Sequence, residues 1–294
     1  MFISRVRVRR DIRNVSNLHH ILRGNGYGAH QMLWDLFPGE QKRAFLFREE
    51  IAKEQLPHHR GAKGEPVYYL VSRDVPSKDY PLLSVESKPY TPRLVAGDRL
   101  AFRLRANPTI ARKVEGKKNS VRHDVVMDAQ RNLLHDLAKK IGIPVSGEKS
   151  TLKRAIFSAW VQTGSVSIAD DLRGVLEENE RHREAVEKKL VPTSLLDFAL
   201  KACADKALEV WLEEKGKGNG FVLVRDDQKD RLKFQAEGYQ WHALPKKGKT
   251  AGFSSVDFEG EIEVIEPERF AEALFSGIGP AKGFGCGLML VRRV

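Results

Sequence analysis

The sequence predicts an α+β protein built from two related modules, with a helical section inserted into the second. Three observations indicate this class. Strand and helix signals alternate in residues 1–110, a similar series recurs toward residue 294, and most of the chain between the two series has the apolar spacing of helices. Such a mixture favours small sheets that carry helices on one face.

The first series begins with the strand Phe2–Val8, in which basic and apolar residues alternate. A glycine-rich loop then precedes a helix over 29–37, which Pro38 and Gly39 end. The apolar residues of this helix are expected to face a core: Met32, Leu33, Leu36 and Phe37. Extended segments follow at 44–50, 67–72, 82–85 and 99–108. This order fits the split β-α-β pattern of ferredoxin-like domains, so we expect a first domain at residues 1–110.

The remainder of the chain is expected to form a second domain, residues 111–294. Helical segments are predicted at 129–141, 150–163, 168–190 and 192–215. Strands are predicted at 221–224, 232–243 and 253–264, followed by a short helix that opens at Pro267 and by a final strand. This series is a second copy of the split pattern if its first strand lies within 101–126. The helical insertion then falls at about 127–195.

The charge balance indicates a polyanionic partner, most simply a nucleic acid. Lysine and arginine number 50 against 39 acidic residues, which gives a net charge of +11 and a pI near 9.6. The charge is also clustered, because residues 99–122 hold eight basic residues and one acid, Glu115. Composition alone leaves a basic but unspecialised surface as the alternative.

Cysteine content and hydropathy argue against several other classes. Cys203 and Cys286 are the two cysteines, far apart in sequence, which disfavours a disulfide framework and a cysteine zinc site and fits a reducing cytoplasm. The first residues lack the apolar core of a signal peptide, and no apolar run is long enough to span a bilayer. We therefore expect a cytoplasmic protein that has no membrane partner.

Residues 277–294 combine five glycines within eleven residues, one lysine and an apolar strand. Such glycines leave backbone N–H groups accessible and let a ligand approach closely. A P-loop is excluded because no Lys-Ser/Thr pair follows the glycines, and the helix-to-strand order is the reverse of a dinucleotide-binding turn. Two interpretations remain: a helix cap with a turn, or a backbone contact with RNA.

Three separated stretches resemble one protein family. They read YGAHQMLWDLFP at 27–38, FRLRANPT at 102–109 with RHDVVM at 122–127, and GIGPAKGFGCGL at 277–288. In this order and spacing they are similar to CasE, also called Cse3, the CRISPR-associated endoribonuclease of the type I-E Cascade complex. The section at about 127–200 is longer than the family core, and the resemblance carries nothing over to it.

The resemblance implies two tandem ferredoxin-like, RRM-like domains. It also implies metal-independent cleavage of the CRISPR precursor RNA at the 3′ base of the repeat stem-loop. The enzyme of this family stays bound to the mature CRISPR RNA and joins the other Cascade subunits. The family's catalytic histidine falls on His30, and its assisting tyrosine falls on Tyr27.

RNA cleavage by its own 2′-OH is chemistry that these two residue types can assist. One group must remove the 2′-OH proton, and another must protonate the departing 5′-oxygen. A histidine has an ordinary pKa near 6.5, and a helix N-terminus favours its neutral form while attracting a phosphate. Which of His30 and Tyr27 is the acid and which is the base does not follow from the sequence.

The basic segments are expected to contact the backbone of an A-form stem, which offers proteins mainly its phosphates and minor groove. The candidate RNA-binding residues are Arg103, Arg105, Arg112, Lys113, Lys117, Lys118, Arg122, Lys246, Lys247, Lys249, Gly279, Lys282 and Gly283.

A non-catalytic subunit that only holds a stem-loop is the alternative to an enzyme. A metal-dependent nuclease is disfavoured because no carboxylate cluster and no HExxH pattern occurs, and because the adjacent pairs His19-His20 and His58-His59 are unsuited to one metal. We therefore expect no metal site and no cofactor.

Overall fold

The computed structural model describes residues 1–9, 27–51, 66–113, 115–116, 118–145, 147–164, 166–186, 188, 190–226, 231–244 and 251–294. The chain divides into two compact units. The first, here called the sheet unit, comprises Met1–Asn107, Lys215–Val224 and Leu232–Val294. The second, here called the helical unit, comprises Pro108–Glu214 and Arg225–Arg231.

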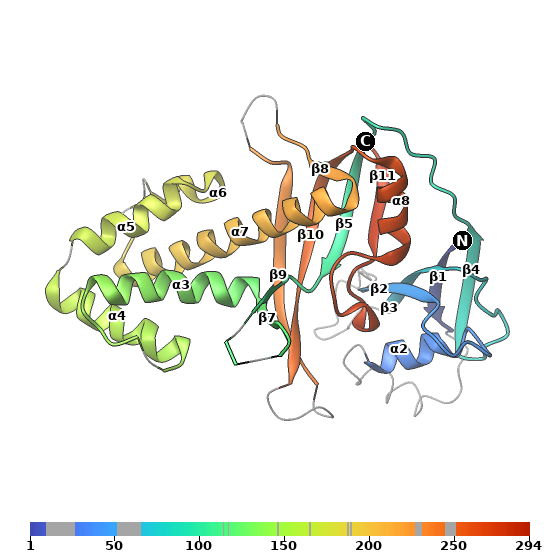
Figure 1. Ribbon diagram of the computed structural model, residues 1–294, viewed down its shortest axis with the longest axis horizontal. Coiled ribbons are helices and arrows are strands. Elements are labelled where there is room, and N and C mark those ends of the chain that lie inside the picture. The colour runs from blue at the N-terminus through green and yellow to red at the C-terminus, as the bar shows by residue number, and fades with distance from the viewer. Residues whose placement is uncertain are drawn as a thin grey trace, which may run out of the picture. The chain divides into compact units, whose positions relative to one another are not determined.

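The first sheet of the sheet unit holds the first four strands of the chain (Figure 1). Its elements are β1 (Phe2–Val8), α2 (Tyr27–Trp34), β2 (Phe45–Ile51), β3 (Pro66–Ser72) and β4 (Leu83–Pro89). The strands lie in the order β2-β3-β1-β4 and every neighbouring pair is antiparallel. This is the strand order of a split β-α-β module, with β3 between β1 and β2. Residues 73–82 join β3 to β4 without a helix.

The core of this module lies between α2 and the sheet. The four apolar residues predicted to face a core are all buried, with Leu33 and Leu36 fully so. They pack with Phe45, Phe47 and Tyr68. The helical spacing of the apolar residues therefore predicted correctly how α2 is oriented.

The second sheet repeats the same strand order. Its elements are β5 (Arg99–Ala106), α7 (Pro192–Asn219), β8 (Phe221–Leu223), β9 (Phe234–Ala243), β10 (Gly252–Val264), α8 (Pro267–Ser276) and β11 (Met289–Arg293). The order is β11-β5-β10-β8, with β9 paired to β10 as an added strand. The ring of Phe270 on α8 meets that of Phe221 on β8 at 5.4 Å, which fixes this helix to the sheet.

One expected strand belongs to the other sheet. We expected the segment at 99–108 to close the first module, but β5 pairs with β10 and β11 instead. Alternation of apolar residues identified the strand, whereas its partners depend on packing with residues about 150 positions later, where Leu104 lies opposite Phe258. The first strand of the second module is therefore β5. We propose that the two modules meet within residues 90–98.

Helix α7 is longer than the sequence indicated. We expected it to end at Gly216, but it continues through Asn219. A Cβ on Gly216 would lie 2.6 Å from the Phe221 carbonyl oxygen, so glycine lets the last helical turn pack directly on β8. The left-handed residue that ends the helix is Gly220, at φ +77°.

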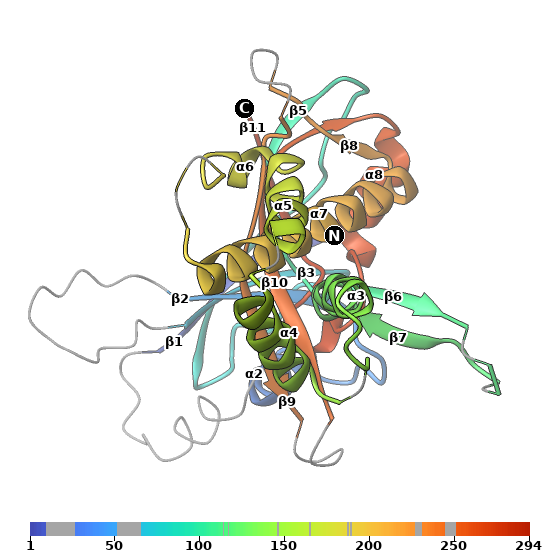
Figure 2. The ribbon, with the colours of Figure 1, turned by 90° about the vertical axis from the view of Figure 1, so that its left-hand side faces the viewer.

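In sequence, most of the helical unit is inserted between β5 and the last five residues of α7, Lys215–Asn219. It begins with the hairpin of β6 (Thr109–Arg112) and β7 (Val121–Asp124), visible in Figure 2 with α3 directly after it. The helices are α3 (Val125–Lys140), α4 (Lys149–Thr163), α5 (Val166–Glu177) and α6 (Glu180–Arg183). Neither β6 nor β7 is among the strands predicted from the sequence. Asp124 then caps α3 by accepting a hydrogen bond from the Met127 N–H at 2.8 Å.

The helical unit has a hydrophobic core of its own. Leu134, Ile156, Leu172 and Leu196 are fully buried within it. His182 contacts Asp205 at 2.7 Å between α6 and α7, with both side chains mostly buried. None of the helices in the described part of the chain combines the length and apolar character needed to cross a bilayer.

Candidate active site

His30 is the fourth residue of α2, so it lies in the first turn of the helix, as expected. Its imidazole ring is half-buried among aromatic side chains. The ring centroid lies 5.4 Å from that of Trp34 in an edge-on arrangement and 6.0 Å from that of Phe47 in a nearly parallel one. The buried face of α2 and the strand β2 therefore hold the ring in one orientation.

The surroundings of His30 favour the neutral imidazole. Burial lowers its pKa from the usual value, and the positive charge of Arg43 lowers it further. The Nδ1 atom is buried and has no hydrogen-bond partner among the described residues. An imidazolium needs acceptors for both ring N–H groups, so this lack also disfavours the charged form.

The glycine-rich loop is folded against His30, although about 250 residues separate the two in sequence. After α8 the chain forms the short helix η2 (Lys282–Phe284), which lies beside α2 and β2. A Cβ on Gly283 would lie 4.0 Å from Nε2 of His30 and 3.8 Å from Nη1 of Arg43. The backbone of Gly283, which carries no side chain, therefore lies beside Nε2, whereas the other imidazole nitrogen, Nδ1, is buried.

Hydrogen bonds and left-handed residues give the loop its shape. The Ile278 N–H donates to the Gly287 carbonyl at 2.9 Å, and the Gly287 N–H donates to the Arg105 carbonyl at 2.7 Å. Gly285 and Gly287 have φ values of +82° and +94°, which other residues rarely adopt. A Cβ on Gly285 would also lie 3.2 Å from the Phe47 ring. The glycine-rich loop therefore has a defined conformation within the sheet unit, and it also ends helix α8.

Two cationic groups lie at this loop. Nζ of Lys282 donates a hydrogen bond to the Ser276 carbonyl at 2.6 Å, and both burial and Arg43 lower the pKa of Lys282. Arg43 precedes β2 and was not predicted as a site residue. The sequence offers no signal for it, because it stands in a polar segment beside Lys42 without a recognisable motif.

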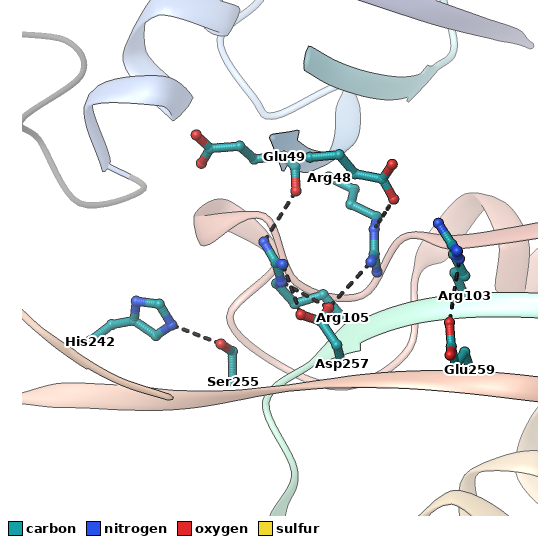
Figure 3. A network of polar contacts seen from close by, with 9 residues as sticks. Arg48, Glu49, Arg103, Arg105, His242, Ser255, Asp257 and Glu259 are labelled. Carbon is teal, nitrogen blue, oxygen red and sulfur yellow. Dashed lines mark hydrogen bonds and ion pairs between the residues drawn. The ribbon is translucent and has the colours of Figure 1, made fainter. Parts of the chain in front are cut away.

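A network of charged groups connects the two sheets of the sheet unit (Figure 3). Arg105 on β5 donates to both carboxylate oxygens of Asp257 at 2.8 and 3.0 Å and to the Glu49 carbonyl at 3.1 Å. Arg48 on β2 reaches the same Asp257 at 3.2 Å and Glu50 at 3.0 Å. Arg105, a predicted RNA contact, is therefore already engaged within the protein.

The other predicted RNA-binding residues differ in their ion pairing and in their exposure to solvent. Arg103 pairs with Glu259 at 3.5 Å, but both side chains are more than half exposed. Arg112 pairs with Asp128 at 2.5 Å. Lys113, Lys118 and Arg122 are exposed residues of the β6–β7 hairpin in the helical unit. Gly279 is half-buried in the glycine-rich loop.

Several predicted residues lie outside the described residues: Lys117, Lys246, Lys247 and Lys249. Tyr27 is the first residue of α2, but its side chain lies outside the description. The proximity of Tyr27 to His30 therefore stays a prediction. Of the predicted site residues, the structure brings His30, Lys282 and Gly283 together.

The described residues contain no group of three or more histidine, cysteine, aspartate or glutamate side chains that is arranged to hold a metal ion. Cys286 follows the η2 loop but is fully buried, and burial raises the pKa of its thiol to about 12. A protonated, inaccessible thiol is a poor nucleophile.

The model of the CRISPR associated protein family matches residues 1–293, and the chain belongs to that family. A curated relative is the CRISPR-associated endoribonuclease Cse3 of Thermus thermophilus, which is 34% identical over 97 residues. The matched part covers 32% of this chain and spans 45% of the length of that relative. These findings confirm the resemblance to the CasE family that the three sequence stretches indicated.

Solved structures share the fold of this chain. The structure of Thermus thermophilus Cse3 bound to an RNA representing a pre-cleavage complex superposes with a TM-score of 0.55 at 20% identity, over 99% of this chain and 98% of that one. A crystal structure of a CRISPR-associated protein from Thermus thermophilus gives a TM-score of 0.51 at 20% identity, over 99% and 100% of the two chains. The predicted α+β class with paired ferredoxin-like modules is confirmed.

Proposed function

We propose that this protein is a metal-independent endoribonuclease that cleaves CRISPR precursor RNA at the 3′ base of the repeat stem-loop. We further propose that it stays on the mature CRISPR RNA within a Cascade surveillance complex. The observation that carries the proposal is the half-buried His30, whose Nε2 lies beside the bare backbone of Gly283. Family membership and the endoribonuclease activity in the name of the Thermus relative support it.

The proposed reaction needs no group beyond the protein and the RNA. The 2′-oxygen attacks the adjacent phosphorus, the bond to the 5′-oxygen breaks, and the products are a 2′,3′-cyclic phosphate and a 5′-hydroxyl. The lowered pKa of His30 favours it as the base that takes the 2′-OH proton. We assign the proton that the leaving 5′-oxygen needs to Tyr27 or to water.

This assignment predicts the pH dependence of cleavage. Because the pKa of His30 is lowered, the imidazole loses its proton below the usual value of about 6.5. With the protein below saturation, where the rate reports the free enzyme, the single-turnover rate should therefore be flat at neutral pH and should fall only as the pH drops through that lowered pKa. A rate measured from pH 4.5 to 8.5 tests this. A rate that instead declines as the pH rises through 7 would make His30 the acid.

Exposed basic residues of the hairpin are proposed to bind stem phosphates. Replacing Lys113, Lys118 and Arg122 together by glutamine should weaken stem-loop binding. The salt slope of the binding constant should fall by about 1 for each phosphate that the variant no longer neutralises. Fluorescence anisotropy at several salt concentrations measures this slope.

The matched control removes an equal number of positive charges from other positions of the helical unit. Lys139, Arg154 and Lys201 are exposed on its helices and are not predicted to bind RNA. Their replacement by glutamine should leave the slope near that of the wild type. An equal decrease in both triple variants would show that net charge, and not the hairpin, determines the affinity.

The alternative function is a stem-loop-binding subunit without catalysis. One experiment separates it from the enzyme: incubation with repeat RNA in EDTA, with and without a 2′-deoxy sugar just upstream of the cut. Cleavage in EDTA that the deoxy sugar blocks supports the proposed mechanism. Tight binding without cleavage supports the binding subunit, and a requirement for magnesium contradicts the metal-free reaction.

A further inference from the structure

Arg43 is a positive charge at the candidate active site that lacks a counter-charge among the described residues. No described carboxylate acts on its pKa, which partial burial alone lowers, and the residue is exposed to solvent. The two other arginines near β2, Arg48 and Arg105, both pair with Asp257. All three arginines lie in the sheet unit, but Arg43, unlike the other two, forms no ion pair with a described residue.

The position of Arg43 is defined by the glycine-rich loop. Its Nη1 lies 3.8 Å from the point where Gly283 would carry a Cβ, and Nε2 of His30 lies 4.0 Å from the same point. The imidazole of His30 and the guanidinium of Arg43 therefore both lie next to the position that a side chain of residue 283 would occupy. A phosphodiester group placed there can meet both, and a larger side chain at Gly283 would fill the space.

The electrostatics of the site point to an anion. Arg43 disfavours the protonated forms of both His30 and Lys282, so it lies close enough to repel each of them when they are charged. The remaining neighbours of His30 that define its position are aromatic: Trp34, Phe45 and Phe47. The positively charged groups of this site lie beside a backbone without a side chain, and no described carboxylate compensates them. A bound phosphate would stabilise such an arrangement.

We propose that the Arg43 guanidinium binds the non-bridging oxygens of the scissile phosphate and is a catalytic residue of the cleavage reaction. This inference rests on the proposed function. The guanidinium neutralises the charge that develops on these oxygens as the 2′-oxygen attacks. A bound phosphate also compensates the charge of Arg43, so the pKa of His30 rises on binding and the imidazole becomes a better proton acceptor for the 2′-OH.

The test compares R43Q and R43K with K42Q, which removes a charge from the adjacent exposed residue. R43Q should slow single-turnover cleavage of the repeat RNA by about tenfold to a hundredfold, with the dissociation constant changed by less than about threefold. R43K should recover part of the rate, because lysine keeps the charge without the planar fork. K42Q should cleave within about twofold of the wild type.

Two readouts separate catalysis from folding. Phosphorothioate substitution of the non-bridging oxygen that Arg43 binds should slow the wild type more than it slows R43Q. The pKa of His30, followed by NMR of labelled histidine, should be higher in free R43Q than in the free wild type, because the positive charge of Arg43 lowers it. Melting curves of R43Q and K42Q should coincide with that of the wild type.

The two proposals fail in distinguishable ways. If the wild type does not cleave, the proposed function is wrong and the catalytic role of Arg43 falls with it. If the wild type cleaves and R43Q cleaves equally fast, only the role of Arg43 is overturned. The same holds if R43Q loses rate only in proportion to its loss of affinity.

Discussion

Replacing His30 by alanine should abolish RNA cleavage and leave stem-loop affinity within a few-fold of the wild type. A positioned general base contributes about 10²–10⁴-fold to such a rate. Binding should persist because the charges proposed to hold the stem, such as Lys113 and Arg122, belong to other elements. Single-turnover cleavage and fluorescence anisotropy on the same RNA measure the two quantities.

A control is needed because His30 also packs against Trp34 and Phe47. Removing the ring will lower stability somewhat, so the melting temperature of H30A must lie well above that of the assay. His135→Ala, at a half-buried histidine on α3, gives a matched loss of imidazole and should retain full activity. If H30A instead loses most of its affinity for RNA, His30 is a binding or structural residue.

The second large effect is expected at Asp257, whose carboxylate is shared by two arginines. Asp257→Ala should lower the free energy of unfolding by about 3 kcal/mol, because it leaves the charge of Arg48 with fewer partners in a place where its side chain is only 7% exposed. The remaining partner of Arg48 is Glu50, at 3.0 Å. Calorimetry should show a decrease in melting temperature of about 6–12 °C.

The same strand supplies the control. Glu259 lies two residues along β10 and pairs with Arg103, with exposed fractions of 55% and 61%. Because solvent screens this pair, Glu259→Ala should cost less than about 1 kcal/mol. Asp257→Asn, which keeps the side-chain size, should resemble D257A. Equal melting temperatures for D257A and E259A would mean that the network contributes nothing to stability.

The sequence predicted the elements of the fold better than their pairing. Periodicity located α2, β10 and α8, because one face of each is buried in a core that the residue pattern reveals. The same periodicity could not assign β5 to its sheet, since its partners are chosen by contacts between distant residues. The hairpin of β6 and β7 was not predicted, because lysines and a glycine obscure its short strands.

The candidate site was predicted in part, for a related reason. His30 and the glycine-rich loop were recognised separately, and their proximity became visible only when η2 was seen to lie beside α2. Arg43 carries no motif, so only its position in space distinguishes it from the other basic residues. Conversely, Arg105 was chosen for its charge, and the structure shows that Asp257 already engages that charge.

The strand β5 also has a consequence for the order in which the chain folds during synthesis. The strands β1 to β4 are complete by Pro89, so the first sheet has all its partners early. The next strand, β5, waits until β10 and β11 emerge at Gly252–Val264 and Met289–Arg293. During that interval both of its edges are open, and such an unpaired strand is prone to associate with other chains. Yield in cells should therefore depend on how quickly the last forty residues follow.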